Sequence, residues 1–434
     1  MTDNDTPFWM TGKKVSEKKF CDWFTKKHEL IFYGGNFFDE NGIVDDTVLR
    51  KMITREIEDW VEKDLAMQVD KIVRAMRLLT VVSEISRDIN VVHLHNGDYF
   101  IDTGSFEQRT EITPNRLTVN YNPYAPKPEK FLEYMSALFD ETDIPTVQEF
   151  LGYCLIPTTM CQYMLLLIGE GGEGKSVLGQ ILMKMFGNSA TKTKVSTLVS
   201  NRFALANLEN KLIMLDDDMQ MAALRETDLI KEIITNEGKM LMENKNCPFH
   251  EGDVYARIIA FSNGVLDALF DKSEAFRRRQ LVINVLPKDP GRVDDRLLSQ
   301  KLESEAEDIL LWMIEGLKRL RSNGFNFTIS ERTLKNLHDL RRNDNNIILF
   351  LESENYLCFG PDQASTTKAI YRVYKQWCED NFYDPFKEKT FSNQLAKLSK
   401  HYGMEPCNRI PVDHGKYNRG YKGVAVRLDP GLEL

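Results

Sequence analysis

Long apolar stretches, a signal-like start and paired cysteines are all missing from this sequence. No apolar run reaches about 18 residues, the length that a helix needs to cross a bilayer. The start, MTDNDTPFWM, lacks the basic and then apolar pattern of a secretory signal. The seven cysteines are scattered and include no C-x-x-C pair, which argues against a disulfide framework or a structural zinc site. We therefore expect a cytoplasmic protein without a membrane partner.

Overall positive charge is also missing, but the charge is unevenly distributed. The net charge of −9 arises within residues 1–150, which hold 18 Lys and Arg against 27 Asp and Glu. Residues 387–428 instead carry nine basic residues against three acidic ones. Any contact with nucleic acid must therefore come from local basic surface, because the whole protein does not attract phosphate at long range.

The 434 residues are too many for one core and predict about three domains. Residues 16–88 have helical periodicity, and Asn96-Gly97 lies between two strand-like segments, which is typical of a hairpin. His93 and His95 flank this turn, and we expect them at the surface rather than on a metal. Residues 163–286 alternate between strand and helix patterns, which predicts a parallel α/β sheet. Residues 366–428 have two helical patterns followed by a strand pair.

The segment LLLIGEGGEGKSVLGQILMKMFGN, residues 165–188, carries the strongest chemical signal. It fits G-x-x-x-x-G-K-[ST], with an apolar strand before it and an amphipathic helix after it. Glycines let backbone amides turn inward around phosphate oxygens, and the helix adds its positive N-terminal dipole. The lysine would reach the β- and γ-phosphates, and the serine hydroxyl would bind Mg²⁺. The predicted ATP-binding residues are Gly169, Gly171, Gly172, Glu173, Gly174, Lys175, Ser176 and Val177.

Three consecutive acids follow the next buried strand, in KLIMLDDDMQ, residues 211–220. Open α/β sheets bind ligands at the carboxyl ends of their strands, so these acids are suited to the phosphate site. One carboxylate would hold Mg²⁺ and a second would polarise the attacking water. Strand alternation leaves the register among Asp216, Asp217 and Asp218 open; we favour Asp217 and Asp218, with Asp217 on the metal.

Two further segments follow in an order that fits the same chemistry. YARIIAFSNG, residues 255–264, is an apolar strand ending at Asn263, whose amide can orient the attacking water. EAFRRRQLVINV, residues 274–285, brings three arginines just before the next strand. An oligomeric motor presents an arginine there to the γ-phosphate of its neighbour.

Residues 240–255, MLMENKNCPFHEGDVY, have the pattern of a hairpin with Lys245 and Asn246 at its tip. An ordinary surface hairpin and a DNA-contacting loop are both compatible with this pattern.

Together these segments resemble the superfamily 3 helicases, the AAA+-type motors of viruses, phages and mobile elements. The closest resemblance is to the phage and plasmid primase-helicase branch, which is related to the poxvirus-type helicase. It runs from about residue 25 to residue 428 and includes NPYAPKPEKF, EFLGYCLIP and EAEDILLWMIEGLKRL. The polymerising primase domain often fused upstream in that branch has no counterpart here, so we do not expect priming activity.

The resemblance assigns roles to the residues that match its motifs. It implies that Lys175 and Ser176 form the phosphate loop, that Asp217 and Asp218 are the paired acids, and that Asn263 ends the third strand. Among Arg277, Arg278 and Arg279, the match favours Arg278 as the arginine finger. It also implies that Lys245, with Asn246 beside it, grips DNA in a central channel.

We accordingly expect a multidomain protein with an α/β AAA+-type P-loop core. The predicted parts are an N-terminal mostly helical domain (1–125), the ATPase core (126–295), a helical connector (296–360) and a winged-helix-like domain (361–434). The expected function is that of an ATP-dependent DNA helicase that acts on single-stranded and forked DNA in a bacterial host cytoplasm, and the resemblance implies a hexameric ring. A separate primase or another replication protein is an expected partner.

Three alternatives remain at this stage. The first is an ATP-dependent initiator or loader that remodels DNA without processive unwinding. The second is a DNA-binding replication protein that uses ATP only as a structural ligand. The third, a phosphoryl-transferring kinase, is less favoured, because it would need an acceptor pocket rather than a basic hairpin.

Overall fold

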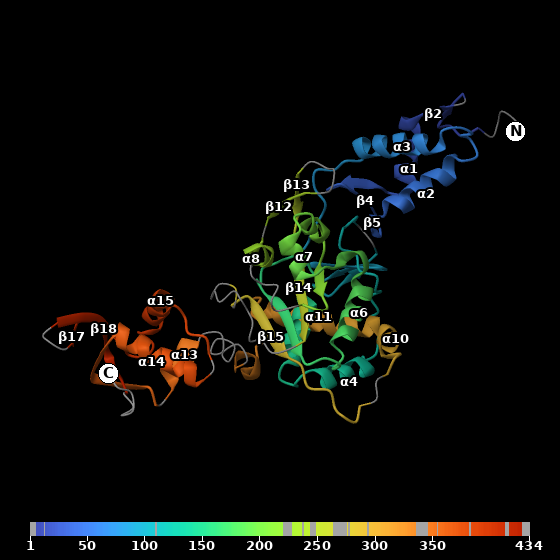
Figure 1. Ribbon diagram of the computed structural model, residues 1–434. Helices are drawn as coiled ribbons and strands as arrows, with labels where there is room; N and C mark the ends of the chain where they lie inside the picture. Colours follow the sequence, from blue (N-terminus) through green and yellow to red (C-terminus); the bar gives the residue numbers. More distant parts are fainter. Residues whose placement is uncertain are drawn as a thin grey trace. The chain divides into compact units, whose positions relative to one another are not determined.

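The computed structural model describes residues 6–427 apart from 13, 109–110, 220–227, 237, 244–248, 264–275, 277, 293–294, 336–345, 354, 382 and 413–415. The chain forms two compact units, residues 1–334 and 335–434 (Figure 1). The predicted border at 360/361 differs from this division. Helix α13 (Asn346–Glu352), which we had assigned to the connector, buries Ile347, Phe350 and Leu351 in the core of the second unit.

The first segment of unit 1 combines three helices with short strands. The helices are α1 (Glu17–Lys27), α2 (Asp46–Ile57) and α3 (Leu65–Leu79), and they share a core that includes Phe20, Ile53 and Ile72. The strands are β1 (Met10–Thr11), β2 (Lys14–Val15), β3 (Ile31–Tyr33), β4 (Asn36–Asp39) and β5 (Gly42–Val44). The expectation of continuous helices over 16–88 is therefore wrong for residues 31–44. Gly34 and Gly35 have φ of +54° and +84° there, so the chain turns back as a hairpin.

The hairpin predicted around Asn96-Gly97 is present. Strands β6 (Val91–Leu94) and β7 (Gly97–Phe100) pair antiparallel, with β8 (Phe106–Glu107) beside β7. His93 is buried rather than on the surface as we expected. Its Nδ1 lies 2.8 Å from Asp98 Oδ1, and Arg116 donates to the same oxygen at 2.9 Å. Nδ1 of the buried histidine thus has a carboxylate partner directly across the hairpin.

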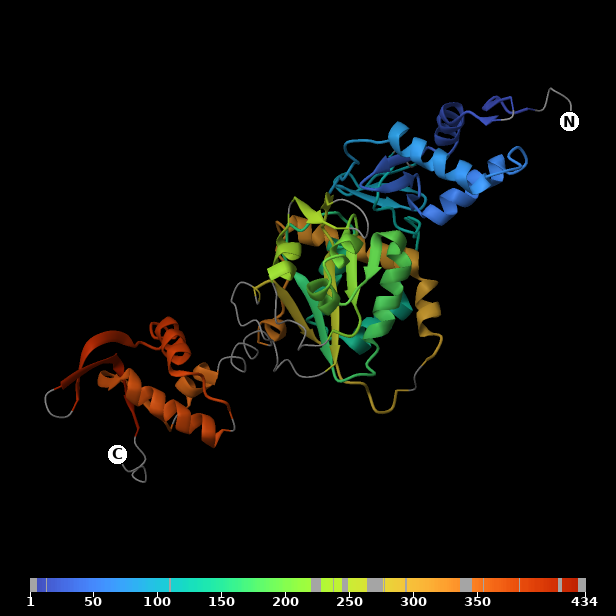
Figure 2. The same cartoon turned by 45° about the horizontal axis from the view of Figure 1, so that its top comes forward.

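A five-stranded parallel sheet forms the centre of unit 1, as the alternating pattern predicts (Figures 1 and 2). Its order is β10-β11-β14-β9-β15, and neighbouring strands are parallel throughout. The strands are β9 (Met164–Gly169), β10 (Ala190–Lys192), β11 (Ile213–Asp216), β14 (Arg257–Asn263) and β15 (Gln280–Asn284). Helix α6 (Lys175–Phe186) approaches the sheet closely at Gly179, where an added Cβ would lie 2.8 Å from the Leu215 side chain.

Helices that precede the sheet-forming residues in the sequence pack on helices that follow them. Helix α5 (Ile144–Tyr153) meets α11 (Ala306–Ser322), and the buried Glu149 carboxylate accepts from Arg319 Nε at 2.6 Å. Helices α4 (Glu129–Leu138) and α10 (Leu298–Glu303) are also neighbours. Unit 1 also contains α7 (Val195–Ser200) and α8 (Asp228–Thr235), with 3₁₀ turns at Gly187–Ser189 and Ala204–Leu208.

From residue 346 to residue 427, the part of unit 2 that the structure describes has the element order α, β, α, α, β, β. After α13 come β16 (Leu357–Thr366), α14 (Thr367–Asp380), α15 (Glu388–Leu398), β17 (Glu405–Val412) and β18 (Lys416–Val426). The three strands form an antiparallel sheet in the order β16-β18-β17. Two helices and a strand pair are confirmed. The sequence analysis missed β16, because its Gly and Pro interrupt the strand pattern and its pairing shifts register between Phe359 and Ala364.

Within the part of the chain that the structure describes, no helix combines the length and the apolar character that crossing a bilayer requires.

Candidate functional site

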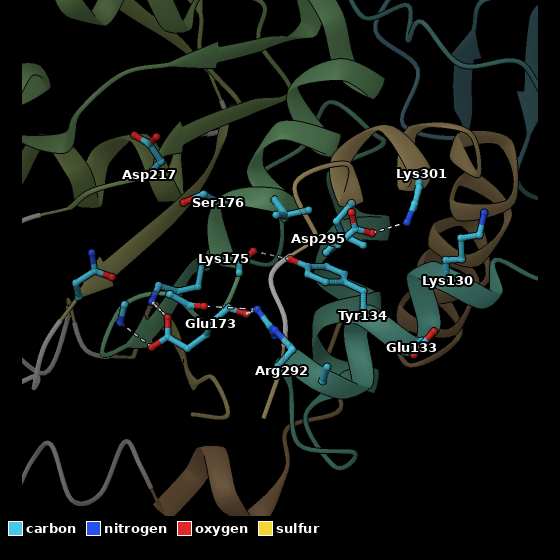
Figure 3. Close-up of a pocket in the computed structure, with 17 residues that line it drawn as sticks. Lys130, Glu133, Tyr134, Glu173, Lys175, Ser176, Asp217, Arg292, Asp295 and Lys301 are labelled. Atoms are coloured by element: carbon cyan, nitrogen blue, oxygen red, sulfur yellow. Dashed lines mark hydrogen bonds and ion pairs between the residues drawn. The ribbon is translucent and has the colours of Figure 1, made fainter. Parts of the chain in front are cut away.

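A cavity of about 750 Å³ opens at the carboxyl end of β9, where the glycine-rich loop leads into α6 (Figure 3). This volume lies within the usual range for small-molecule sites. The cavity is lined by residues of the loop and the start of α6, of the ends of β11 and β14, of helices α4 and α10, and of the segment that precedes α10: Lys130, Glu133, Tyr134, Ala137, Gly171, Gly172, Glu173, Gly174, Lys175, Ser176, Val177, Asp217, Asn263, Arg292, Asp295, Leu298 and Lys301.

The loop has a backbone that only glycine adopts easily. Gly171, Gly172 and Gly174 have φ of +111°, +85° and +115°. Gly169 precedes them at the strand end, and a Cβ there would lie 2.5 Å from Glu173 Oε1, so the Glu173 side chain would have to shift. The conformation of the loop therefore favours glycine most strongly at positions 171, 172 and 174.

The two charged residues of the loop face inward and contact each other. Lys175 and Glu173 are 5% and 3% exposed, and Lys175 Nζ donates to Glu173 Oε2 at 2.8 Å. The Gly171 amide donates to the other carboxylate oxygen at 2.7 Å. Burial alone raises the pKa of the Glu173 carboxyl, but these hydrogen bonds outweigh it and the pKa lies below its ordinary value.

Two residues from distant segments hold the loop from outside. Tyr134 on α4 donates its hydroxyl to Gly174 O at 3.0 Å, and burial raises the pKa of this phenol. Arg292 donates from Nη2 to Glu173 O at 3.0 Å. Figure 3 shows both side chains reaching the loop from the side opposite Asp217. The glycines therefore permit the conformation of the loop, and the hydrogen bonds from Tyr134 and Arg292 hold it in place.

The three consecutive acids have three different environments. Asp216, the last residue of β11, is 2% exposed, and its carboxylate accepts from the Val195 amide at 2.7 Å and the Asp218 amide at 3.3 Å. Burial raises the pKa of Asp216, although these amide bonds oppose the shift. Its carboxylate thus fixes local backbone. Asp217 lines the cavity and pairs with Lys192 at 2.5 Å. Asp218 is largely exposed, does not line the cavity, and lies 3.5 Å from Lys194 Nζ.

Asn263 lies beside the glycine-rich loop because of the sheet order. It ends β14, which is next to β9, and its Cα pairs with that of Gly169. Its side chain is exposed to the cavity. The structure therefore brings together Lys175, Ser176, Asp217 and Asn263 from three segments of the sequence.

Two of these residues suit a magnesium ion. Ser176 and Asp217 both line the cavity and supply the hard oxygen atoms that Mg²⁺ prefers (Figure 3). Mg²⁺ keeps several waters and takes further oxygens from phosphates, so one hydroxyl and one carboxylate are a sufficient protein contribution. Among the described residues no group of three or more His, Cys, Asp or Glu side chains that could hold a metal ion occurs.

Arg278 lies away from this cavity. It lies two residues before β15, whose first residue, Gln280, pairs with Met164 at the start of β9. The loop is at the other end of β9, roughly 17 Å further along at about 3.3 Å per residue. Arg278 is exposed, Arg279 is partly buried, and Arg277 lies outside the described residues.

The predicted hairpin between the second and third strand segments is present. Strands β12 (Lys239–Met242) and β13 (His250–Asp253) pair antiparallel, and its tip, with Lys245 and Asn246, lies outside the described residues. Its base is anchored on the first segment of unit 1. The buried Asp253 accepts from Tyr33 Oη at 2.7 Å and pairs with Arg87 Nη1 at 3.0 Å. Burial and the bond to Asp253 raise the pKa of Tyr33 to about 12.

Sequence reasoning missed the half of the cavity that lies beyond the loop. Tyr134 and Arg292, with Lys130, Glu133, Asp295, Leu298 and Lys301, come from α4, from α10 and from the segment that precedes α10. No local pattern marks them, because each is an ordinary helix or loop residue that folding brings to the loop.

Comparison with known proteins gives a family for the central segment and a fold for the chain. Residues 167–279 match a family of unknown function, DUF5906, and this stretch includes the loop, the three acids and Asn263. No curated protein sequence matches the chain.

The chain resembles structures of the C-terminal region of NrS-1. Two structures of its A form, without ligand, align with a TM-score of 0.56 and 13% identity over 93% of this chain and 98% of theirs. A third ligand-free structure aligns with a TM-score of 0.53 and 12% identity over 94% and 98%. The likeness thus extends over almost the whole of both chains, and at this identity it is a likeness of fold.

Proposed function

We propose that this protein is an ATP-dependent DNA helicase that serves the replication of a phage or another mobile element. The observation that carries the proposal is the meeting of Lys175, Ser176, Asp217 and Asn263 at one cavity, on the carboxyl edge of a parallel sheet. This is where open α/β sheets bind ligands, and the residue types match the needs of phosphoryl transfer.

Each of these residues has a definite task in the proposed reaction. The loop amides and Lys175 bind the phosphates of ATP and neutralise charge that develops on them. Ser176 and Asp217 would hold Mg²⁺, which supplies additional positive charge next to the phosphate oxygens. Asn263, beside the start of the loop, orients the attacking water.

The position of Arg278 supports an oligomeric motor. In its own subunit it lies at the amino edge of the sheet, whereas the cavity is at the carboxyl edge. An arginine that acts on ATP from this position must do so in a neighbouring subunit. We therefore propose a ring, hexameric by resemblance to the superfamily 3 helicases, in which Arg278 completes the site next door.

Two regions are proposed to bind DNA. The hairpin β12–β13 would contact single-stranded DNA through Lys245 and Asn246. The element order in the described residues of unit 2 is compatible with a winged helix, and every basic residue of the segment 387–427 that the structure describes is exposed. In that arrangement α15 is the helix that enters the major groove, and the hairpin β17–β18 is the wing.

The comparisons are compatible with this proposal. The parallel sheet, with β9 between β14 and β15, supports the proposal of an α/β motor core. The likeness to the C-terminal region of NrS-1 agrees with the phage branch of the resemblance.

The test compares wild type with Lys175→Ala for ATP hydrolysis and for strand displacement on forked DNA. We expect both activities in wild type and neither in the variant. Hydrolysis without strand displacement would instead favour an initiator or loader. Binding of ATP without turnover would favour a protein that uses ATP as a structural ligand.

A further inference from the structure

Glu173 occupies the donors that the proposed nucleotide needs. Its two carboxylate oxygens accept from the Gly171 amide at 2.7 Å and from Lys175 Nζ at 2.8 Å (Figure 3). A loop amide and the loop lysine are the groups that hold phosphate oxygens in a glycine-rich loop of this type. The carboxylate therefore stands in the position of an anionic oxygen pair of the β-phosphate.

The contact is strong because it is buried. Glu173 and Lys175 are both almost fully shielded from water, and a charge-assisted hydrogen bond in such a site is stronger than one at the surface. A phosphate that enters must exchange both hydrogen bonds. The negative charge of the Glu173 carboxylate also repels the phosphate for as long as the carboxylate remains next to Lys175.

The flanking residues allow the side chain to leave. Glu173 lies between Gly172 and Gly174, whose φ values are +85° and +115°. Glycine adopts such positive φ values readily because it has no Cβ. Glycine on both sides permits a peptide rotation that turns the carboxylate out of the loop. Arg292 and Tyr134 bind the carbonyls of Glu173 and Gly174, so they hold the backbone on the C-terminal side of the Glu173 Cα.

We propose that the Glu173 carboxylate is an internal competitor of polyphosphate, and that nucleotide binds only by displacing it from Lys175 and Gly171. Glu173 thereby sets the affinity of the site for the phosphate chain of ATP. This inference rests on the proposed function, because it concerns the same cavity.

Charge and position can be separated by a matched control in the same loop. Glu170 carries the same charge three residues away, but it is exposed and does not line the cavity. Glu173→Gln and Glu170→Gln therefore change the net charge equally, and only Glu173→Gln removes the negative charge that Lys175 binds.

The experiment measures binding by isothermal titration calorimetry for wild type, Glu173→Gln, Glu173→Ala and Glu170→Gln. The ligands are ATP, inorganic pyrophosphate without Mg²⁺, and adenosine. We expect both Glu173 variants to bind ATP and pyrophosphate about tenfold more tightly than wild type, a change of ~1.4 kcal/mol. Adenosine should bind all four proteins alike, because it has no phosphate to compete with the carboxylate. Glu170→Gln should remain close to wild type.

Two results would overturn the inference. Equal effects of Glu173→Gln and Glu170→Gln would show that only net charge matters. Weaker binding of pyrophosphate by folded Glu173 variants, with the fold checked by circular dichroism, would show that the carboxylate preorganises the loop instead.

The proposed function fails separately from this inference. If wild type binds ATP and the Glu173 variants do not differ from it, only the role of Glu173 is lost. If wild type and every variant bind neither ATP nor pyrophosphate, both are lost. If the Glu173 variants bind ATP and pyrophosphate and wild type binds neither, the inference is supported, because the carboxylate then excludes the phosphates completely.

Discussion

Asn263 and Gly169 are partners across two neighbouring parallel strands, each the last residue of its strand. They are 94 positions apart in the sequence, and the order of the sheet alone makes them neighbours. The consequence is that an amide side chain stands next to the loop that we propose to bind the phosphates.

Replacing Asn263 with alanine should slow ATP hydrolysis on the order of 10²-fold, because the attacking water loses a positioning group. ATP affinity should be unchanged, since Lys175 and the loop amides remain. Steady-state turnover and equilibrium binding measure the two quantities. Parallel loss of both would show that Asn263 supports the loop rather than the reaction.

Because Asp216, Asp217 and Asp218 have different environments, we expect a different outcome from substitution of each. Asp217→Asn should lose Mg²⁺-dependent hydrolysis with an unchanged fold, because Asp217 is the acid that lines the cavity. Asp216→Ala should destabilise the protein by about 1–3 kcal/mol, because it leaves the Val195 amide without its buried acceptor. Asp218→Ala should be nearly neutral in stability.

Hydrolysis rates at several Mg²⁺ concentrations, together with thermal unfolding, distinguish these variants. Loss of hydrolysis in a stable Asp218→Ala protein would restore our initial preference for Asp217 and Asp218 as a functional pair. A fully active Asp217→Asn protein would exclude Asp217 from the metal site.

Arg278→Ala should bind ATP but hydrolyse it on the order of 10³–10⁵-fold more slowly, as expected for loss of an arginine finger. Mixing it with Lys175→Ala subunits should restore part of the activity, because some junctions then pair an intact loop with an intact arginine. Arg279→Ala is the adjacent control. Absence of rescue at every mixing ratio would contradict action between subunits.

Ending the chain before Lys335, at the border between the two units, should lower duplex DNA affinity much more than ATP binding. A cut at the border predicted from the sequence, 360/361, would instead divide β16. In the full chain, Lys416→Glu and Arg419→Glu in the wing should each reduce the salt slope of duplex binding by about 0.9. If truncation left duplex binding intact and disrupted the oligomer, unit 2 would be an assembly domain.

Gly316→Ala should destabilise unit 1 by about 1–3 kcal/mol although alanine favours helices. A Cβ at Gly316 on α11 would lie 2.3 Å from Gln148 O on α5, and backbone cannot move aside as a side chain can. Gly238→Ala is the matched control, because a Cβ there has nothing within 4 Å. Chemical denaturation of the two variants measures the difference, and similar stabilities would contradict close packing of α5 on α11.

The sequence by itself determined the parts of the site that are local. The glycines around Lys175 and Ser176 specify a loop whose conformation few other residues allow, and alternating apolar segments specify the parallel strands. The hairpins at Asn96-Gly97 and at β12–β13 are likewise properties of short segments. Such features depend on backbone sterics and on the spacing of apolar residues. Both are set by residues that are close together in the sequence.

Only the tertiary structure decided how the acids differ and what surrounds the loop. Asp216, Asp217 and Asp218 are identical in sequence terms, and burial, a backbone amide and the cavity give them different environments. Tyr134 and Arg292 reach the loop from distant segments, and the partner of Lys175 within it, Glu173, depends on side-chain orientation. These contacts result from packing between parts of the chain that are far apart in the sequence. A local sequence pattern does not predict the free energy of such packing.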